Sequence, residues 1–272
     1  ETSGPSIYTV STEAQLVSLT NTIGAQSFTT SGQCLNWFAT QTDKMVFNID
    51  YPAIVTDGLV LNLDAGFTPS YPTINTTWYD VSSGVNNGTL TNGPTYSSAN
   101  GGSIVFDGSN DYVDFFAPNL GTTTTVEMWC KVNAINSGMM MGWQLYDVYA
   151  AYSSMGYNTA NSDVYGLTSS QVTSLGLVGN WVQYIFEMKS DVSYVNNKIY
   201  INGVSQTLSQ ITSTENVGAR TFNGGYGRIS GWRQSTNYVM NMLCNSFRIY
   251  NRALTASEVL QNYNAQKSRF GL

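Results

Sequence analysis

From residue 57 onward the sequence consists of short runs in which apolar and polar residues alternate, separated by turn-forming residues. In the run over residues 124–132 every second side chain is apolar, at Val126, Met128, Cys130 and Val132. Side chains of a strand point alternately to the two faces of a sheet, so this period of two predicts strands with one buried face. Asn202-Gly203 lies between two such runs and supplies the positive φ angles that a type I′ hairpin turn requires. Many short strands with regular turns predict a sandwich of two antiparallel sheets.

Residues 1–56 do not follow this pattern. Thr12 and Gln15 form a capping box in front of an amphipathic stretch, which predicts one short helix over residues 12–24. The remaining pieces of this segment are strand-like but show no clear arrangement. We therefore expect residues 1–56 to be an N-terminal extension that acts as a docking arm.

The end of the chain changes period again. Thr255 and Glu258 form a second capping box, so a short helix is predicted within residues 254–272. Residues 57–272 are accordingly predicted to be one all-β domain that ends in a helix and a tail.

The composition excludes several classes of function. Only 10% of the 272 residues are charged, against about 25% in an average soluble protein. The chain has no histidine, which removes Ser-His-Asp and Cys-His catalysis and His-ligated metals. A net charge of −6 without a basic run argues against nucleic-acid binding. No stretch reaches the roughly 20 apolar residues of a membrane span, and the start at Glu1 rather than Met suggests a processed protein or a fragment.

The three cysteines, Cys34, Cys130 and Cys244, leave at least one thiol unpaired. They lack a C-x-x-C spacing, which excludes a zinc site of that type. Two interpretations remain open: buried thiols, or a bridge between Cys130 and Cys244 on neighbouring strands.

Seven segments together resemble one family of domains. In chain order they are DGLVLNLDAG, YDVSSGVNNGTL, SIVFDGSNDYVDF, TVEMWCKV, NWVQYIFEM, KIYINGV and FRIYNRALTASEV. This order is similar to that of laminin-G-like, concanavalin A-like jelly-roll domains, over about residues 57–260. The resemblance implies a jelly roll of two antiparallel sheets, a fold that hosts lectins, adhesion modules, glycosidases and inert spacers.

The two ends of the match carry a narrower resemblance. The segments DYPAIVTDGLVLNLDAG and RIYNRALTASEVLQNYNAQKSRFGL look like those of virion structural proteins of tailed phages, especially marine ones. There the domain is an appended module on capsids, tails or fibres. The resemblance thus implies a virion-surface location, with other virion subunits and further copies of the chain as partners.

The stretch FDGSNDYVDF, residues 106–115, is rich in acidic residues. Asp107, Ser109 and Asp111 have the alternate spacing of a calcium loop, but an EF-hand needs Gly and Glu where Tyr112 and Pro118 stand. We therefore predict a turn. Some laminin-G-like domains bind calcium at one rim, and the resemblance makes three carboxylates the candidates for such a site, with turn capping as the alternative. They are Asp64, Asp80 and Asp111.

Glycoside hydrolysis needs two carboxylates about 5–10 Å apart. The E-x-D-x-x-E arrangement of retaining enzymes with this fold is absent. Only Glu127 and Glu187 lie on predicted central strands, where they would have to converge from different strands. We predict that the chain is not an enzyme.

Aromatic residues gather in two stretches, residues 139–167 and 224–238. Such Tyr-, Met- and Gly-rich segments suit adaptable contact surfaces, although packing in the core is the alternative. The candidates for glycan or partner binding are Trp143, Tyr146, Tyr149, Tyr226, Arg228, Trp232 and Arg233.

These features favour a non-catalytic structural, decorating or adhesion protein on the outside of a phage virion. Residues 1–56 and 139–167 would dock onto neighbouring subunits, and weak glycan attachment would use another rim. The alternative is an extracellular glycan-binding adhesin of a cell. Neither hypothesis needs a cofactor, unless glycan binding depends on calcium.

Overall fold

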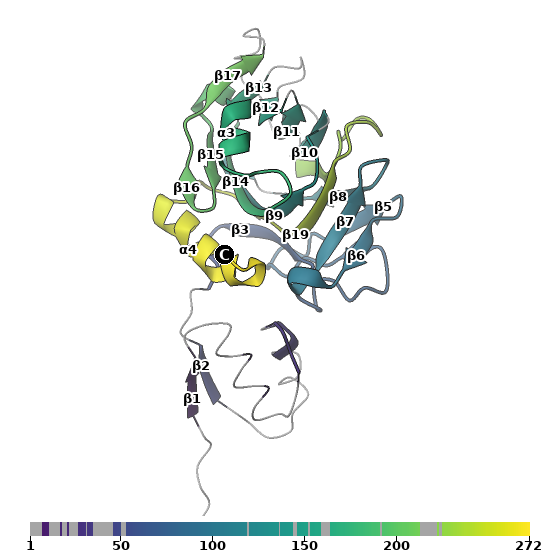
Figure 1. Cartoon of the computed structure of the whole chain (residues 1–272), viewed down its shortest axis with the longest axis vertical. Helices are drawn as coiled ribbons and strands as arrows, with labels where there is room; N and C mark the ends of the chain where they lie inside the picture. Colours follow the sequence, from purple (N-terminus) through teal and green to yellow (C-terminus); the bar gives the residue numbers. More distant parts are fainter. Residues whose placement is uncertain are drawn as a thin grey trace, which may run out of the picture.

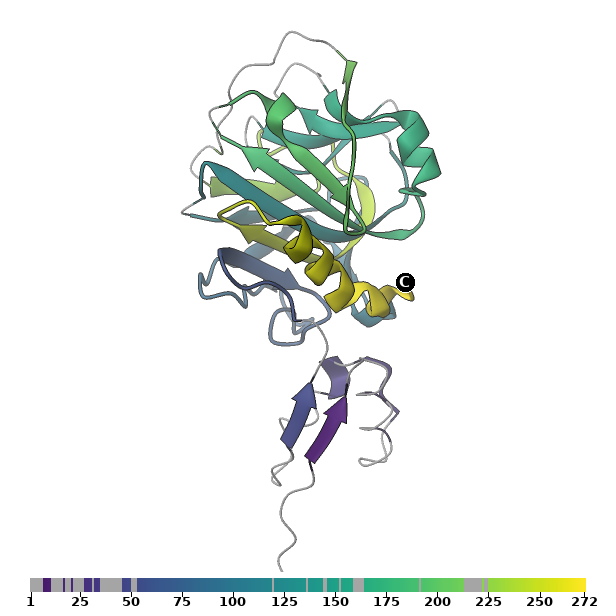
Figure 2. The same ribbon diagram turned by 90° about the vertical axis from the view of Figure 1, so that its left-hand side faces the viewer.

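The computed structural model of the chain describes most residues after 52 and short pieces before it. The described residues are 7–10, 17, 21, 27–30, 32–34, 46–49, 53–118, 120–135, 137–143, 146–151, 153–158, 164–190, 192–212, 222 and 225–272. Two large antiparallel sheets pack into a sandwich (Figures 1 and 2), which confirms the predicted fold class. Before the sandwich, β1 (Ile7–Val10) pairs in parallel with β2 (Val46–Ile49). The helix predicted over residues 12–24 lies almost wholly outside the described residues.

One sheet has nine strands. From edge to edge they are β17 (Ser209–Thr212), β13 (Val164–Leu167), β12 (Ser154–Asn158), β11 (Tyr146–Ala151), β10 (Gly138–Trp143), β18 (Tyr226–Ile229), β8 (Tyr112–Phe116), β5 (Gly88–Thr91) and β4 (Thr77–Trp78).

The other sheet has eight strands. They are β16 (Val204–Ser205), β15 (Lys198–Ile201), β14 (Trp181–Lys189), β9 (Thr123–Val132), β19 (Asn241–Tyr250), β7 (Ser103–Asp107) and β6 (Thr95–Ser97), with β3 (Leu59–Asp64) also on β19. Asn202 and Gly203, between β15 and β16, have φ angles of 49° and 83°, as the predicted turn requires.

Strand β19 is long enough to pair with two strands along one edge. Its first half pairs with β7 and its second half with β3. The change-over falls at Asn245, where the register with β9 shifts. The bulged Asn245 is buried, donates its side-chain amide to the carbonyl of Gly102 and accepts the backbone N–H of Ala65 at 2.8 Å. The bulge thus joins the two neighbouring strand ends.

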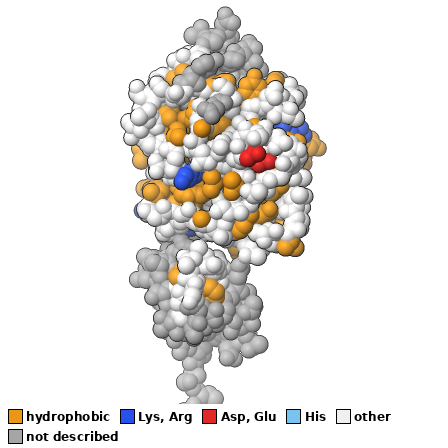
Figure 3. Space-filling view, turned by 45° about the vertical axis from the view of Figure 1, so that its right-hand side comes forward, with side chains coloured by type: hydrophobic (Ala, Val, Ile, Leu, Met, Phe, Trp, Pro, Cys, Tyr) orange, Lys and Arg blue, Asp and Glu red, His pale blue; other side chains and the backbone are white. Residues whose placement is uncertain are grey.

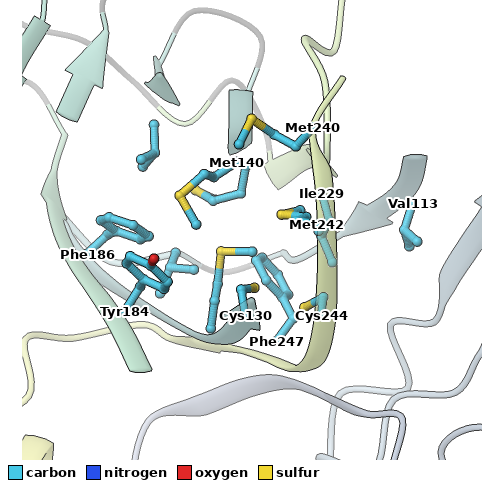
Figure 4. Close-up of a cluster of buried hydrophobic side chains, with 14 of the residues drawn as sticks. Val113, Cys130, Met140, Tyr184, Phe186, Ile229, Met240, Met242, Cys244 and Phe247 are labelled. Atoms are coloured by element: carbon cyan, nitrogen blue, oxygen red, sulfur yellow. The ribbon is translucent and has the colours of Figure 1, made fainter. Parts of the chain in front are cut away.

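The core lies between the sheets and contains the side chains that the alternation predicts (Figure 4). Val126, Met128 and Val132 are fully buried there. Cys130 and Cys244 stand directly opposite each other on β9 and β19 as buried thiols with no disulfide bond between them. The buried-thiol interpretation is therefore the correct one for this pair.

The outer face of the eight-stranded sheet is covered by the C-terminal segment, yellow in Figures 1 and 2. It consists of α4 (Ala256–Gln266) and the 3-10 helix η4 (Lys267–Phe270). The capping box of Thr255 and Glu258 is present, as predicted. The Trp129 ring stacks on Phe270, with ring centroids 4.3 Å apart. Short helices α3 (Ser169–Ser174), η1 (Ala99–Gly101) and η2 (Tyr194–Asn196) lie in connections. No helix in the described ranges is long and apolar enough to cross a membrane.

Candidate functional site

The three calcium candidates have other roles in the fold. Asp64 accepts hydrogen bonds from Arg269 Nη1 at 2.9 Å and from Arg248 Nη2 at 3.1 Å. Burial opposes ionisation of Asp64, but the two guanidinium groups outweigh it and hold the pKa of this carboxyl below its usual value. Asp64 is therefore a partner in a buried ion-pair network rather than an open ligand.

Asp80 and Asp111 both cap turns. Asp80 accepts the backbone N–H groups of Asn62, Ser82 and Asn86, each at 2.8 Å. Because three N–H groups already donate to the Asp80 oxygens, few lone pairs remain on this carboxylate to bind a cation.

Asp111 accepts the backbone N–H of Asp107 at 3.1 Å, and Asp107 in turn accepts that of Ser109 at 2.7 Å. Gly108 has a φ of 80°, so the stretch 106–115 is the predicted turn. The part of the chain that the structure describes holds no cluster of three or more acidic or cysteine side chains that could bind a metal. The calcium candidates do not converge.

The two glutamates considered for catalysis belong to the eight-stranded sheet. Glu127 is fully buried under α4 and accepts hydrogen bonds from Gln183 at 2.9 Å and from Asn262 at 2.7 Å. Glu187 pairs with Lys198 at 3.3 Å. Both carboxylates hold neighbouring elements together.

Two of the aromatic candidates are core residues, which corrects their assignment to a contact surface. Trp143 and Tyr146 are both fully buried between the sheets. Trp143 meets Phe115 edge to face, and Tyr146 stacks on Phe222. Their side chains on β10 and β11 point inward, so these two strands supply the core as well as the opposite face of the sheet.

Five side-chain positions form a row across the outer face of the nine-stranded sheet. Asp114, Arg228, Gly142, Asp147 and Asn158 are direct register partners from β8 to β12. Directly opposite residues share a face of a sheet. The face is the outer one, because the residues that alternate with the row line the core: Val113, Ile229, Met141, Val148 and Tyr157. We call these five positions the outer row.

Arg228 organises the loop beside the outer row. It is 5% exposed, and its Nε and Nη2 atoms bond the two carboxylate oxygens of Asp114 at 2.7 and 3.2 Å. Its Nη1 atom donates to the carbonyls of Trp232 at 3.1 Å and Ser235 at 2.9 Å. The guanidinium also lies 3.5 Å from the centre of the Tyr112 ring. Arg228 therefore positions Trp232 rather than offering its own donors to solvent.

Three aromatic rings gather next to the outer row, and we call them the aromatic cluster: Tyr149, Trp232 and Tyr238. Tyr238 meets each of the other two rings edge to face at 6.1 Å. Tyr149 packs on Met139 in a small apolar group outside the main core. Tyr238 is 41% exposed, so one part of the cluster reaches solvent.

The structure thus brings together four of the candidates from the sequence. Tyr149, Arg228 and Trp232 lie at the outer row, and Arg233 Nε is 3.8 Å from Asp114 Oδ1. Tyr226 is on the same face and 56% exposed, with its ring against Phe116. Figure 3 shows one side of the sandwich, where charged side chains are sparse and hydrophobic ones gather in patches.

Sequence analysis placed Tyr238 in the aromatic stretch 224–238 but missed Asp114 and Asp147. Asp147 is 1% exposed, and its Oδ1 atom has no hydrogen-bond partner among the described residues. Burial raises the pKa of this carboxyl well above its usual value. Its position between Tyr146 and Val148 is the one signal that the sequence offers, since a polar residue there marks the outward face of a strand.

Residues 107–260 match the sequence profile of the concanavalin A-like lectin/glucanases superfamily. The chain belongs to this superfamily. No curated protein matches the sequence. Among solved structures, the receptor-binding domain of botulinum neurotoxin C/D mosaic serotype is similar with a TM-score of 0.54 and 13% identity, over 78% of this chain and 52% of that domain.

Two further neighbours have comparable similarity. The binding domain of Paraclostridial Mosquitocidal Protein 1 has a TM-score of 0.54 and 16% identity, over 76% of this chain and 52% of that one. Trypanosoma rangeli sialidase in complex with the inhibitor DANA has a TM-score of 0.56 and 14% identity, over 86% and 37%. This chain therefore spans about half the length of the toxin domains and 37% of the sialidase. At these sequence identities the similarity concerns the fold alone.

Proposed function

We propose that this superfamily member is a non-catalytic carbohydrate-binding module whose contact surface is the part of the outer face of the nine-stranded sheet around the aromatic cluster, where Tyr238 is 41% exposed. The observation that carries the proposal is the aromatic cluster, held beside the outer row by the bonds of Arg228 to the 232–235 loop. Sugar rings stack on aromatic faces, and their hydroxyl groups bond charged and amide side chains nearby. The toxin and sialidase neighbours, whose names include receptor-binding and sialidase functions, are in keeping with this class of ligand.

The arrangement of the acidic groups supports binding without hydrolysis. Asp114 and Asp147 are three strands apart, about 14 Å between backbones, which exceeds the spacing of a hydrolytic pair. Asp114 is also engaged by Arg228 through both oxygens. A hydrolase would need one carboxylate free to donate a proton and a second one close by.

The test of the binding face is the replacement Trp232→Ala. We expect about a tenfold loss of affinity for the best ligand found on a glycan array, because one stacked ring contributes about 1.4 kcal/mol. Trp181→Ala is the matched control, since this tryptophan is also partly buried but lies on the eight-stranded sheet. Calorimetric titration measures both. Equal affinity of Trp232→Ala and the unchanged protein would rule out this face.

For the biological context, we propose the outer surface of a tailed-phage particle, with other virion subunits and further copies of the chain as partners. The resemblance of the segments that begin and end the domain supports this context. So does the sheet of β1 and β2, which pairs outside the two large sheets. An antibody against residues 57–272, viewed by electron microscopy on the native source, is expected to label capsids, tails or fibres. Label on cell surfaces instead would favour the adhesin alternative.

A further inference from the structure

The outer face of the nine-stranded sheet is open to solvent over β8 and β18. Tyr226 is 56% exposed, and its ring lies against that of Phe116 with the ring centroids 4.5 Å apart. These two register partners stand two positions along their strands from the Arg228–Asp114 pair, so all four side chains share the outer face. Thr89, opposite Asp114 on β5, is exposed as well. The ring of Tyr226 is therefore accessible to a ligand without a cleft.

We call Tyr226 and Phe116 the tyrosine platform. A tyrosine has few rotatable bonds, and one that already rests on a second ring loses little further freedom when a ligand stacks on it. Sugar rings stack on such aromatic faces. The tyrosine platform is therefore a second exposed aromatic contact point on the face that carries the aromatic cluster.

The charges beside the tyrosine platform do not cancel. Arg228 bonds both carboxylate oxygens of Asp114, at 2.7 and 3.2 Å. Arg233 Nε lies 3.8 Å from Asp114 Oδ1 and has no hydrogen-bond partner among the described residues, and this side chain is 34% exposed. Asp147, the other acidic residue of the outer row, is three strands away from Asp114. One carboxylate thus balances one of the two arginines, which leaves a positive charge at the surface.

We propose that the ligand is an acidic oligosaccharide that places the carboxylate of one sugar on Arg233 and a sugar ring on Tyr226. This inference rests on the proposed function and names its ligand class. A guanidinium group matches the two oxygens of a carboxylate and is more weakly hydrated than an ammonium group. Arg233 directly follows Trp232 in the chain and approaches Asp114, so it connects the aromatic cluster with the tyrosine platform.

The experiment uses the whole chain and an array of neutral, uronic-acid-containing and sialylated oligosaccharides. An acidic group of glycans is expected to give the strongest signal, and which group does so identifies the source of the carboxylate. The best acidic ligand is then compared with its methyl ester, which keeps every ring and removes the charge. The unchanged protein is expected to bind the ester about tenfold more weakly, because the charge-assisted bonds to Arg233 are lost. Arg233→Gln is expected to bind acid and ester equally, with the affinity that the unchanged protein has for the ester.

Three further variants separate the charge from the ring. Arg252→Gln removes an arginine whose side chain is 28% exposed beside α4, and it is expected to keep the tenfold preference for the acid. Tyr226→Ala is expected to bind acid and ester alike about tenfold more weakly, whereas Tyr226→Phe keeps the ring and the affinity. Because Tyr226 is largely exposed, the thermal midpoints of its variants are expected to stay within about 2 °C of the unchanged protein.

A strongest signal from neutral glycans would overturn the inference, and so would a preference for acid over ester that persists in Arg233→Gln. Unchanged affinity in Tyr226→Ala would overturn it as well. If Trp232→Ala still lost binding in any of these cases, the proposed function would survive without this ligand class. If no glycan bound at all, both would fail.

Discussion

Replacing Arg248 by methionine is expected to lower the free energy of unfolding by about 3–5 kcal/mol. Its side chain is 2% exposed, and Nη2 lies 3.1 Å from Asp64 while Nη1 lies 3.8 Å from Glu127. Nη1 also donates to Gln266 Oε1 at 2.7 Å, which ties β19 to the end of α4. Methionine fills a similar volume without the charge, so the loss measures Glu127 left without its cation and Asp64 left with Arg269 alone. Urea unfolding followed by fluorescence gives the difference.

Arg252→Met is the matched control for this change. Arg252 pairs with Asp57, whose side chain is 84% exposed, and with Glu258 at 2.7 Å. Pairs near the surface contribute only about 0–1 kcal/mol, and Glu258 keeps its capping bonds to Thr255, so this variant is expected to lose far less stability than Arg248→Met. Comparable small losses in both variants would show that Arg269 suffices for Asp64, and that Gln183 and Asn262 suffice for Glu127.

Local pattern predicted the strands well, because alternation reports which side chains share a face. Val126 and Val132 are core residues as the period of two requires, and the Asn202-Gly203 turn has the expected positive φ angles. The order of the strands was beyond such reasoning. The change-over on β19 depends on the bulge at Asn245, whose side-chain partner Gly102 is 143 positions away in the chain. No local period encodes a contact of that separation.

The candidate site was only partly predictable for a related reason. Trp143 and Tyr149 belong to the same aromatic stretch, yet one faces the core and the other the outer face. Composition cannot separate them, because both faces of these strands are buried and the alternation between apolar and polar residues is lost. The Arg228–Asp114 pair likewise joins residues 114 positions apart.

The acidic candidates illustrate how one signal serves two roles. A carboxylate at a strand end is typical of calcium sites and of turns alike. Asp80 accepts backbone N–H groups of Ser82 and Asn86 in its own turn, a role that the neighbouring sequence can predict. Asp64 is decided by Arg248 and Arg269, 184 and 205 positions further along the chain. The long-range partner, rather than the carboxylate itself, determines the role.

Removing residues 267–272 is expected to lower the free energy of unfolding by about 3–5 kcal/mol. The truncation deletes Phe270, whose ring stacks on Trp129 at 4.3 Å and touches Trp181 at 4.8 Å. It also deletes Arg269, which donates to both carboxylate oxygens of Asp64 at 2.9 Å. Trp129 is fully buried, so its exposure is expected to shift tryptophan emission to longer wavelength before the protein unfolds.

Removing only Gly271 and Leu272 is the control for this truncation. Leu272 is 50% exposed, and a Cβ atom at Gly271 would meet nothing within 4 Å, so the shorter deletion should change stability by less than about 0.5 kcal/mol. A third variant, Phe270→Ala, separates the contribution of the stacked ring from that of the ion pair, because it keeps Arg269 on Asp64. If Phe270→Ala alone reproduces the emission shift while Asp64 stays paired, the stacked ring and not the ion pair is what shields Trp129. If loss of residues 267–272 changed neither the emission spectrum nor the stability, α4 would be sufficient to cover the sheet without η4.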